Sequence, residues 1–211
     1  MLYWTISMTT PHSSLSVCVF CGSRTGIDAH WAESASEIGQ AIGQRGWSLV
    51  FGAGRTGLMG IVASAALQSG AAVTGVIPRY LTQTEPPLEG LTELLIVETM
   101  IERKIEMVAR SDVFLVLPGG IGTFEELFEV WTATQTNAHQ KPIVIANLAG
   151  YFDDLMDFVE SAREKGFIYP GHLERVLVAN DVAAVIHALT ACSAPGHSPQ
   201  SPTAGPGPSQ G

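Results

Sequence analysis

Short apolar runs alternate with longer segments of helical period along most of this chain, and this alternation constrains the fold more than any other feature. Runs rich in Val, Ile, Leu and Phe predict strands, and apolar residues spaced three or four apart between the runs predict helices. Consecutive parallel strands need such crossover helices, so the pattern predicts an α/β domain with a doubly wound, Rossmann-like, mostly parallel sheet and helices on both faces. The predicted strands are 16–20, 48–51, 72–77, 93–97, 113–117, 143–146 and 175–179, and the predicted helices are 31–42, 58–68, 100–110, 123–135, 153–165 and 181–191.

The two ends of the chain differ in composition from the middle. Residues 1–14 show no clear period and are predicted to form a loose arm, with Met8 as an alternative start to Met1. Residues 193–211 carry no Asp, Glu, Lys or Arg and hold five of the 12 prolines, a composition that cannot support a packed core. We therefore expect a single domain over residues 15–192, followed by a disordered tail.

Charge and hydropathy disfavour several classes of partner. The formal net charge is −9, from 20 acidic and 11 basic residues, whereas nucleic acids and anionic membranes bind basic surfaces. No apolar run approaches the roughly 20 residues of a membrane span, and the first residues lack the basic flank of a signal peptide. We expect a cytoplasmic protein whose partner is a small molecule.

The three cysteines do not form an even disulfide framework. Cys18 and Cys21 make a CxxC pattern, but the chain has no second pair that would complete a zinc site. A redox or metal role is therefore an alternative to the simpler interpretation, in which Cys18 is a buried strand residue. We predict that the protein holds no metal.

Three glycine-containing turns follow predicted strands and lead toward predicted helices: 21–26 (CGSRTG), 52–57 (GAGRTG) and 118–123 (PGGIGT). Glycine lets a ligand approach the backbone, and free N–H groups at a helix start bind anions, although glycine also closes turns that bind nothing. Basic residues gather near the same strand ends in this acidic chain, namely Arg24, Arg55, Arg103 and Lys104. We therefore predict a small anionic ligand with one phosphate at the carboxyl edge of the sheet.

Residues 52–57 also match the G-x-G-x-x-G pattern of dinucleotide-binding oxidoreductases. In those proteins the pattern follows the first strand, and an acidic residue at the end of the next strand binds the ribose. Here the next predicted strand runs into Pro78 and Arg79 without an acid. An oxidoreductase is thus an alternative that the spacing disfavours.

The four residues 123–126, TFEE, have the pattern of a capping box, in which acidic side chains stabilise the first helical turn. The same turn is the predicted phosphate site, where another anion would repel the ligand. Glu126 is better explained if it faces a part of the ligand that becomes electron-poor in the transition state. Arg103 follows strand 93–97 and therefore lies at the same edge, where a guanidinium can bind a phosphate or a sugar hydroxyl.

Residues 118–126, PGGIGTFEE, resemble the PGGxGTxxE signature of the LONELY GUY family of cytokinin riboside 5'-monophosphate phosphoribohydrolases. The resemblance covers about residues 16–168 and includes GLMG at 57–60 and GYF at 150–152. The family's second signature, usually MHxRK, appears as MIERK at 100–104, with Ile101 where His is common. The resemblance implies a Rossmann-like homodimer that needs neither a metal nor an organic cofactor.

The resemblance also implies a reaction, the hydrolysis of the N-glycosidic bond of an N6-substituted AMP to a free base and ribose 5-phosphate. The implied catalytic residues are Arg103, which orders the sugar phosphate, and Glu126, which stabilises the oxocarbenium-like ribose and orients or deprotonates water. The implied substrate-binding residues are Glu85, Lys104, Gly119, Gly120, Ile121, Gly122, Thr123, Phe124, Glu125 and Thr132.

Two alternatives to this activity stay open at the level of sequence. One is a broader AMP or nucleotide nucleosidase with a less selective base pocket, and the other is a nucleotide- or cofactor-binding carrier that cleaves nothing. Lysine decarboxylation, a label often given to this family, is disfavoured because it needs a pyridoxal Schiff-base lysine. None of the chain's three lysines, Lys104, Lys141 and Lys165, has such a setting.

Overall fold

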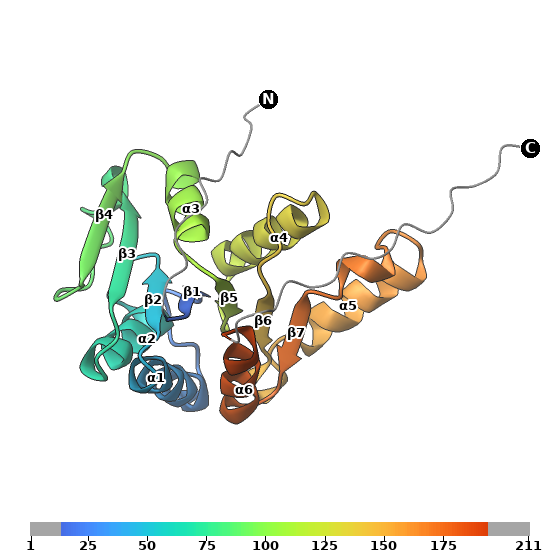
Figure 1. The fold of residues 1–211 in the computed structure, drawn as a ribbon, viewed down its shortest axis with the longest axis horizontal. Coiled ribbons are helices and arrows are strands. Elements are labelled where there is room, and N and C mark those ends of the chain that lie inside the picture. Colours follow the sequence, from blue (N-terminus) through green and yellow to red (C-terminus); the bar gives the residue numbers. More distant parts are fainter. Residues whose placement is uncertain (1–13, 194–211) are drawn as a thin grey trace, which may run out of the picture.

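Seven parallel strands form one sheet in the computed structural model, which describes residues 14–193 (Figure 1). The order across the sheet is β4-β3-β2-β1-β5-β6-β7. Apart from one residue of each, the predicted arm at 1–14 and the predicted tail at 193–211 lie outside the described residues. The strands are β1 (Ser16–Phe20), β2 (Ser48–Phe51), β3 (Val73–Pro78), β4 (Glu93–Val97), β5 (Val113–Val116), β6 (Ile143–Ala146) and β7 (Val176–Ala179).

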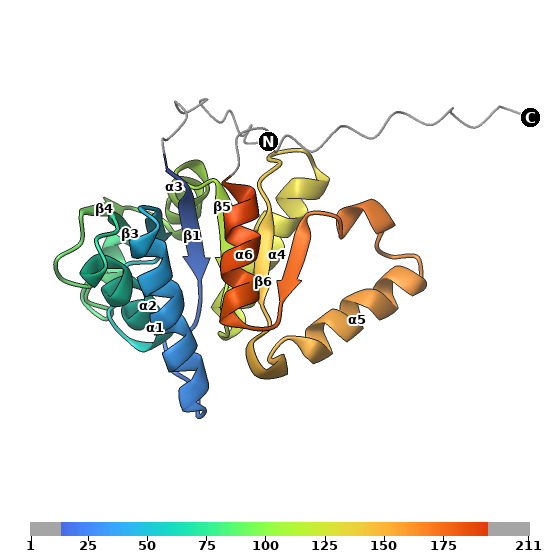
Figure 2. The ribbon, with the colours of Figure 1, turned by 60° about the horizontal axis from the view of Figure 1, so that its bottom comes forward.

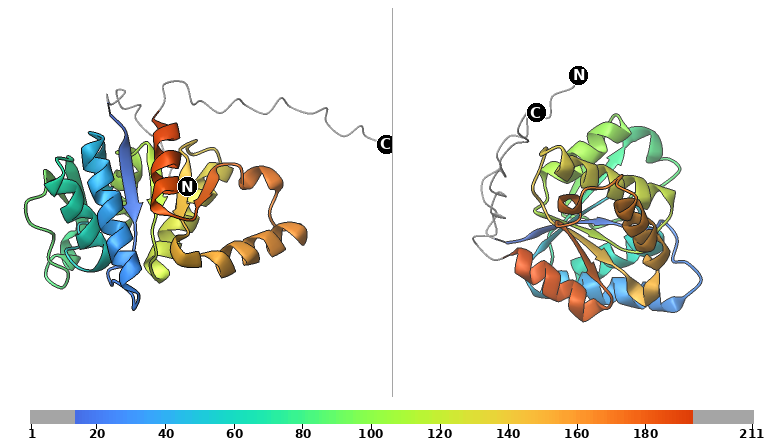
Figure 3. Two further views of the ribbon diagram at one scale, coloured as in Figure 1. Left: turned by 90° about the horizontal axis from the view of Figure 1, so that it is seen from below. Right: turned by 90° about the vertical axis from the view of Figure 1, so that its right-hand side faces the viewer.

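The described residues contain six α-helices, which cover both faces of the sheet; five of them connect strands and the sixth follows β7 (Figure 2). They are α1 (Ala29–Gln44), α2 (Gly57–Gln68), α3 (Met100–Ala109), α4 (Ile121–Gln135), α5 (Asp153–Glu164) and α6 (Val182–Cys192). Figure 3 shows the layers end-on, with α1 in blue and α6 in red on one side of the sheet and α3 and α4 in green to olive on the other. The predicted fold class is confirmed. None of these helices is both long and apolar enough to cross a membrane.

Alternating side chains along β1 divide the core between the two layers. Val17 and Val19 pack beneath α1, α2 and α6, whereas Cys18 and Phe20 pack beneath α3, α4 and α5. All four are at most 3% exposed. A strand covered on both faces reads as a continuous apolar run, which explains why the run SVCVF predicted this strand to the residue.

The CxxC pattern does not form a pair of thiols on one surface. Cys18 belongs to one core layer and Cys21 to the other. Burial raises the pKa of both thiols well above the usual range. Redox chemistry needs an accessible thiolate, so these surroundings disfavour the redox alternative. Within residues 14–193 no group of His, Cys, Asp and Glu side chains is arranged to hold a metal ion.

The strand order reverses between β1 and β5, and the turns that follow these two strands are held together. The N–H of Gly22 donates a hydrogen bond to the carbonyl of Pro118 at 3.0 Å. In doubly wound sheets the crevice at such a reversal, outside the carboxyl ends of the strands, is the usual ligand site. The fold therefore creates a crevice where two of the three predicted glycine turns meet.

Helix α4 begins two residues earlier than predicted, and the predicted capping box at Thr123 is wrong. The N-cap is Gly120, which lies in an extended conformation and supplies no side-chain cap. Thr123 lies inside the first turn and is only 3% exposed. A Cβ on Gly119 would overlap the Thr123 hydroxyl, so the glycine provides the room for this early start. As a result, Glu126 falls in the second helical turn rather than at the cap.

Candidate active site

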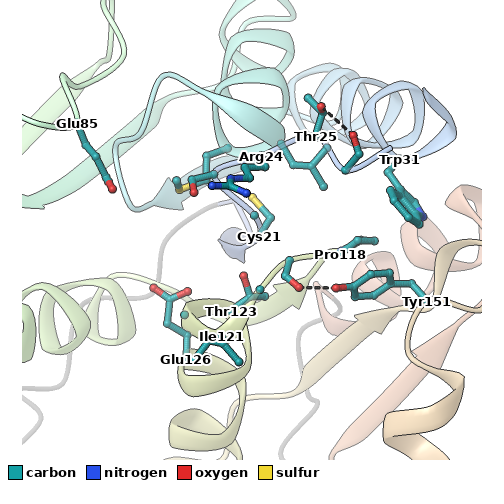
Figure 4. A pocket seen from close by; sticks show the side chains of 18 of the residues that line it. Cys21, Arg24, Thr25, Trp31, Glu85, Pro118, Ile121, Thr123, Glu126 and Tyr151 are labelled. Carbon is teal, nitrogen blue, oxygen red and sulfur yellow. Dashed lines mark hydrogen bonds between the residues drawn. The ribbon is translucent and has the colours of Figure 1, made fainter. Parts of the chain in front are cut away.

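One cavity opens where the turns after β1 and β5 meet, and its volume is about 670 Å³ (Figure 4). Small-molecule sites typically measure ~300–1,000 Å³, so a nucleotide fits. Its walls come from the two turns and from the first residues of α1, α2, α3 and α4. In Figure 4, Glu85 and Glu126 lie at one end, Trp31 and Tyr151 at the other, and Thr123 between them.

Arg103 and Glu126 come together in this cavity from helices α3 and α4. Nη2 of Arg103 lies 3.6 Å from Oε1 of Glu126, and each side chain is only 12% exposed. This separation is longer than a hydrogen bond, so the charges attract one another without sharing a proton. Nε of Arg103 is buried and has no hydrogen-bond partner among the described residues. The pair therefore keeps hydrogen-bonding capacity that a ligand could use.

The surroundings of Glu126 favour its protonated form. Burial raises the pKa of this carboxyl from 4.5 to about 7, because a carboxylate loses hydration in the cavity wall. The positive charges of Arg103 and Lys104 oppose this rise, while the negative charges of Glu125 and Glu129 add to it. A carboxyl that titrates near neutral pH can take a proton from water and release it again.

The start of α4 supplies main-chain donors to the same cavity. By helix geometry, the N–H groups of Ile121, Gly122 and Thr123 have no acceptor within the helix. The N-cap, Gly120, offers no side chain to them, and all four residues line the cavity. Such donors at the positive end of a helix dipole bind an anion such as a phosphate.

Tyr151 holds the glycine turn before α4 in place. Its hydroxyl donates a hydrogen bond to the carbonyl of Gly119 at 2.5 Å, and its ring packs edge-on against Trp31 with centroids 5.5 Å apart. A Cβ on Gly119 would also lie 2.8 Å from the backbone nitrogen of Gly22. The two turns can approach this closely only because residue 119 has no side chain.

The structure brings eight of the twelve predicted site residues to the cavity. They are Glu85, Arg103, Gly119, Gly120, Ile121, Gly122, Thr123 and Glu126. Arg24 from the turn after β1 also lines it, whereas Arg55 from the turn after β2 is exposed and does not. Of the four basic residues predicted near the strand ends, two therefore reach the cavity.

The other four predicted residues do not line this cavity. The ammonium group of Lys104 forms ion pairs with Glu125 at 2.5 Å and Glu129 at 2.7 Å. Phe124 packs edge-on against Phe152 in the core. Thr132 is exposed on α4. The geometry of the α-helix explains this difference. Successive side chains on a helix point about 100° apart, so Lys104 and Glu125 point away from the cavity that their neighbours Arg103 and Glu126 face.

Sequence reasoning missed several residues of the cavity wall, among them Trp31, Met59, Met100 and Tyr151. They come from separate elements and carry no shared spacing, so only the family matches GLMG, MIERK and GYF could have indicated Met59, Met100 and Tyr151. Ile101, which replaces the usual His, is 65% exposed and does not line the cavity. The replacement therefore leaves the cavity wall of this chain unchanged.

Comparisons with known proteins show what this chain is similar to. Residues 59–189 match a family described as "Possible lysine decarboxylase". The cytokinin riboside 5'-monophosphate phosphoribohydrolase of Rhodococcoides fascians is 41% identical over 186 residues, which cover 88% of this chain and 94% of that relative. The protein of the same name from Mycobacterium tuberculosis is 42% identical over 178 residues, which cover 84% of this chain and 93% of that relative.

A solved structure of lower identity shares the fold. The molybdenum cofactor carrier protein of Chlamydomonas reinhardtii is 22% identical, with a TM-score of 0.66, and the match covers 85% of this chain and 98% of that chain. At this identity the likeness concerns the fold alone. The two bacterial relatives decide the family, because they are far more similar in sequence and are matched over nearly their whole length. This chain belongs to the LONELY GUY family of cytokinin riboside 5'-monophosphate phosphoribohydrolases.

Proposed function

We propose that this enzyme hydrolyses the N-glycosidic bond of cytokinin riboside 5'-monophosphates and releases the free cytokinin base and ribose 5-phosphate. The proposal is supported by the relatives named for this reaction, which match over 80% of the chain. The observation that carries it in the structure is the meeting of one guanidinium and one carboxylate, Arg103 and Glu126, beside the free N–H groups at the start of α4.

In this proposal the 5'-phosphate binds to the N–H groups of Ile121, Gly122 and Thr123. Arg24, on the wall formed by the turn after β1, adds a positive charge. Binding energy from the phosphate then positions the ribose, although the phosphate takes no part in bond cleavage. Because Glu126 follows these donors by about one helical turn, the ribose would extend from the phosphate toward it. The base would lie beyond, toward Glu85.

Hydrolysis replaces the bond between the ribose and the base with a bond between the ribose and a water oxygen. The bond from the anomeric carbon to the base nitrogen breaks, and its electron pair stays on the base, while the ribose becomes oxocarbenium-like. Glu126, as a carboxylate, stabilises this cation and accepts a proton from the water that attacks the anomeric carbon. The departing base nitrogen takes up a proton from solvent water, and Glu126 returns the proton that it accepted to the resulting hydroxide, which regenerates the carboxylate. Arg103 orients the sugar phosphate and the Glu126 carboxylate.

A panel of nucleotides tests the reaction. The purified full chain is incubated with N6-isopentenyl-AMP, AMP, the other nucleoside monophosphates and the dephosphorylated riboside, and released bases are detected by mass spectrometry. We expect free base from N6-isopentenyl-AMP at least tenfold faster than from AMP, and almost none from the riboside, because the phosphate supplies positioning energy. Equal turnover of AMP would instead indicate a broad nucleotide nucleosidase. Binding without release of any base would indicate a carrier.

The pH dependence tests the role of Glu126. The reaction needs the carboxylate, and the pKa of this group in the free enzyme is about 7. We therefore expect kcat/KM to rise with pH through about 7 and to level off above 8, with roughly a tenfold deficit at pH 6. The second ionisation of the substrate phosphate, with a pKa of about 6, would appear as a separate change at lower pH. A profile that falls between pH 6 and 8 would mean that Glu126 acts as an acid.

We further propose that the enzyme is a cytoplasmic homodimer. The outer face of α4 exposes Ile121 at 82% and Phe128 at 42%, and neighbouring α3 exposes Ile101 at 65%, an apolar surface that a second copy could cover. The three cysteines are unpaired, as in a reducing compartment. Light scattering on the full chain should give twice the 22.4 kDa of one chain. A monomer at micromolar concentration would contradict the assembly, and fractionation of cells would test the compartment.

A further inference from the structure

Gly52 lies directly after β2, at the carboxyl edge of the sheet, and its lack of a side chain is not explained by backbone conformation. Gly57, a few residues later, has a φ of +63° and therefore needs glycine, but Gly52 is not among the residues with positive φ. Gly52 is also buried, so a flexible surface turn is not the explanation. Glycine can also be required where another group occupies the space that a side chain would take.

The space that a Cβ on Gly52 would take is filled by the guanidinium group of Arg103. Such a Cβ would overlap Nη2 and would lie 2.8 Å from Cζ and 3.4 Å from Nε. All three nearest atoms belong to this one side chain. The guanidinium therefore packs directly against the backbone of Gly52.

Hydrogen bonds do little to hold the guanidinium in this position. Nη1 contacts the thioether sulfur of Met100 at 3.4 Å, a weak acceptor, and Nη2 is 3.6 Å from Glu126. Nε has no partner among the described residues. With so few polar restraints, packing against Gly52 determines where the guanidinium lies relative to Glu126.

We propose that Gly52 is a positioning residue for catalysis, which acts by giving the Arg103 guanidinium its place beside Glu126. This inference rests on the proposed function. A side chain at position 52 would push the guanidinium aside, and because the displaced atoms are the far end of a flexible side chain, the fold can accommodate the change. Misplacement by roughly 1 Å in an active site can cost on the order of 10²-fold in rate.

The experiment is a double-mutant cycle on the full chain with N6-isopentenyl-AMP. We expect Gly52→Ala to lower kcat about 10²-fold, with little change in thermal stability at pH 5, where Glu126 is protonated and does not need the displaced charge. In the Arg103→Ala background the same change should cost less than twofold, since the group it displaces is gone. Gly171→Ala is the matched control, because a Cβ there meets no atom closer than 4.0 Å, and it should keep wild-type activity.

The pH profile adds a readout that a general structural defect would not move. The Arg103 charge lowers the pKa of Glu126, so displacement of the guanidinium should shift the midpoint of kcat/KM in Gly52→Ala to higher pH. Lys104, Glu125 and Glu129 also act on this carboxyl, but they lie outside the cavity and are not displaced by a methyl group at position 52. The buried thiols that interact with it, Cys18 and Cys21, stay neutral at these pH values.

Additive losses in the cycle, wild-type activity of Gly52→Ala, or an unmoved midpoint would each overturn the inference. If wild-type protein releases no base from any nucleotide, the proposed function fails, and the inference is then tested by a crystal structure of Gly52→Ala. A guanidinium displaced from Glu126 would support the positioning role, and an unmoved one would contradict it.

Discussion

Replacing Glu126 by glutamine is expected to abolish base release and to stabilise the protein at alkaline pH. The amide keeps the shape of the side chain but can neither stabilise a cation by charge nor accept a proton from water. Groups in such roles contribute about 10²–10⁴-fold to rates, and we expect a loss of kcat of about 10³-fold. Steady-state assays with N6-isopentenyl-AMP measure this loss, and activity within threefold of wild type would contradict the assignment.

The gain in stability follows from the same burial. The folded pKa of Glu126, about 7, lies above its unfolded value of 4.5, so this carboxyl favours folding at low pH and ceases to do so as pH rises through 7. The ionised form then destabilises the fold by up to about 3 kcal/mol, which the amide would relieve. We expect Glu126→Gln to melt several degrees above wild type at pH 8 and at nearly the same temperature at pH 4.5. Glu164→Gln, a change at an exposed position, is the control and should show no such difference.

Replacing Arg103 by alanine is expected to lower kcat/KM by about 10³-fold, because it removes both a group that orients the sugar phosphate and the cation beside Glu126. Arg103→Lys keeps a positive charge but loses the planar fork, so its activity should fall between those of wild type and Arg103→Ala. Kinetics on the three proteins measure these effects. Equal losses in the lysine and alanine variants would show that the fork matters more than the charge, whereas wild-type activity in the alanine variant would exclude Arg103 from catalysis.

The stability of Arg103→Ala should depend on pH in a defined direction. Removing one partner of a buried ion pair leaves the other charge without compensation, which typically costs ~3–5 kcal/mol. Glu126 can avoid part of this cost by taking up a proton, so the destabilisation should be small at pH 5 and larger at pH 9. Thermal unfolding at both pH values tests this, and an equal loss at both would mean that the two charges do not interact.

Predicted and observed strands agree both in the buried centre of the sheet, as for β1 and β6, and at its exposed edge, as for β4. Strands β1, β2, β4 and β6 were predicted to the residue, because a short apolar run between polar or glycine-containing segments has few alternatives. The start of α4 was missed by two residues. Glycines at 120 and 122 are poor helix formers, so local propensity places the start at Thr123, whereas the room beside Gly119 lets Thr123 enter the helix.

The sequence was enough to name the glycine turn, Arg103 and Glu126 as candidate site residues. A turn before a helix and a family signature both depend on residues that are neighbours in the chain. Whether Lys104 or Arg103 faces the cavity depends on how α3 is rotated as it packs over β3, a long-range contact that no local pattern encodes. The contact between Gly52 and the Arg103 guanidinium likewise depends on how two segments that are far apart in the chain pack against each other. The sequence alone determined the order of strands and helices and the chemistry available at their ends. Which of those groups share one cavity depends on packing between distant elements, because side-chain direction and desolvation arise only when those elements come together.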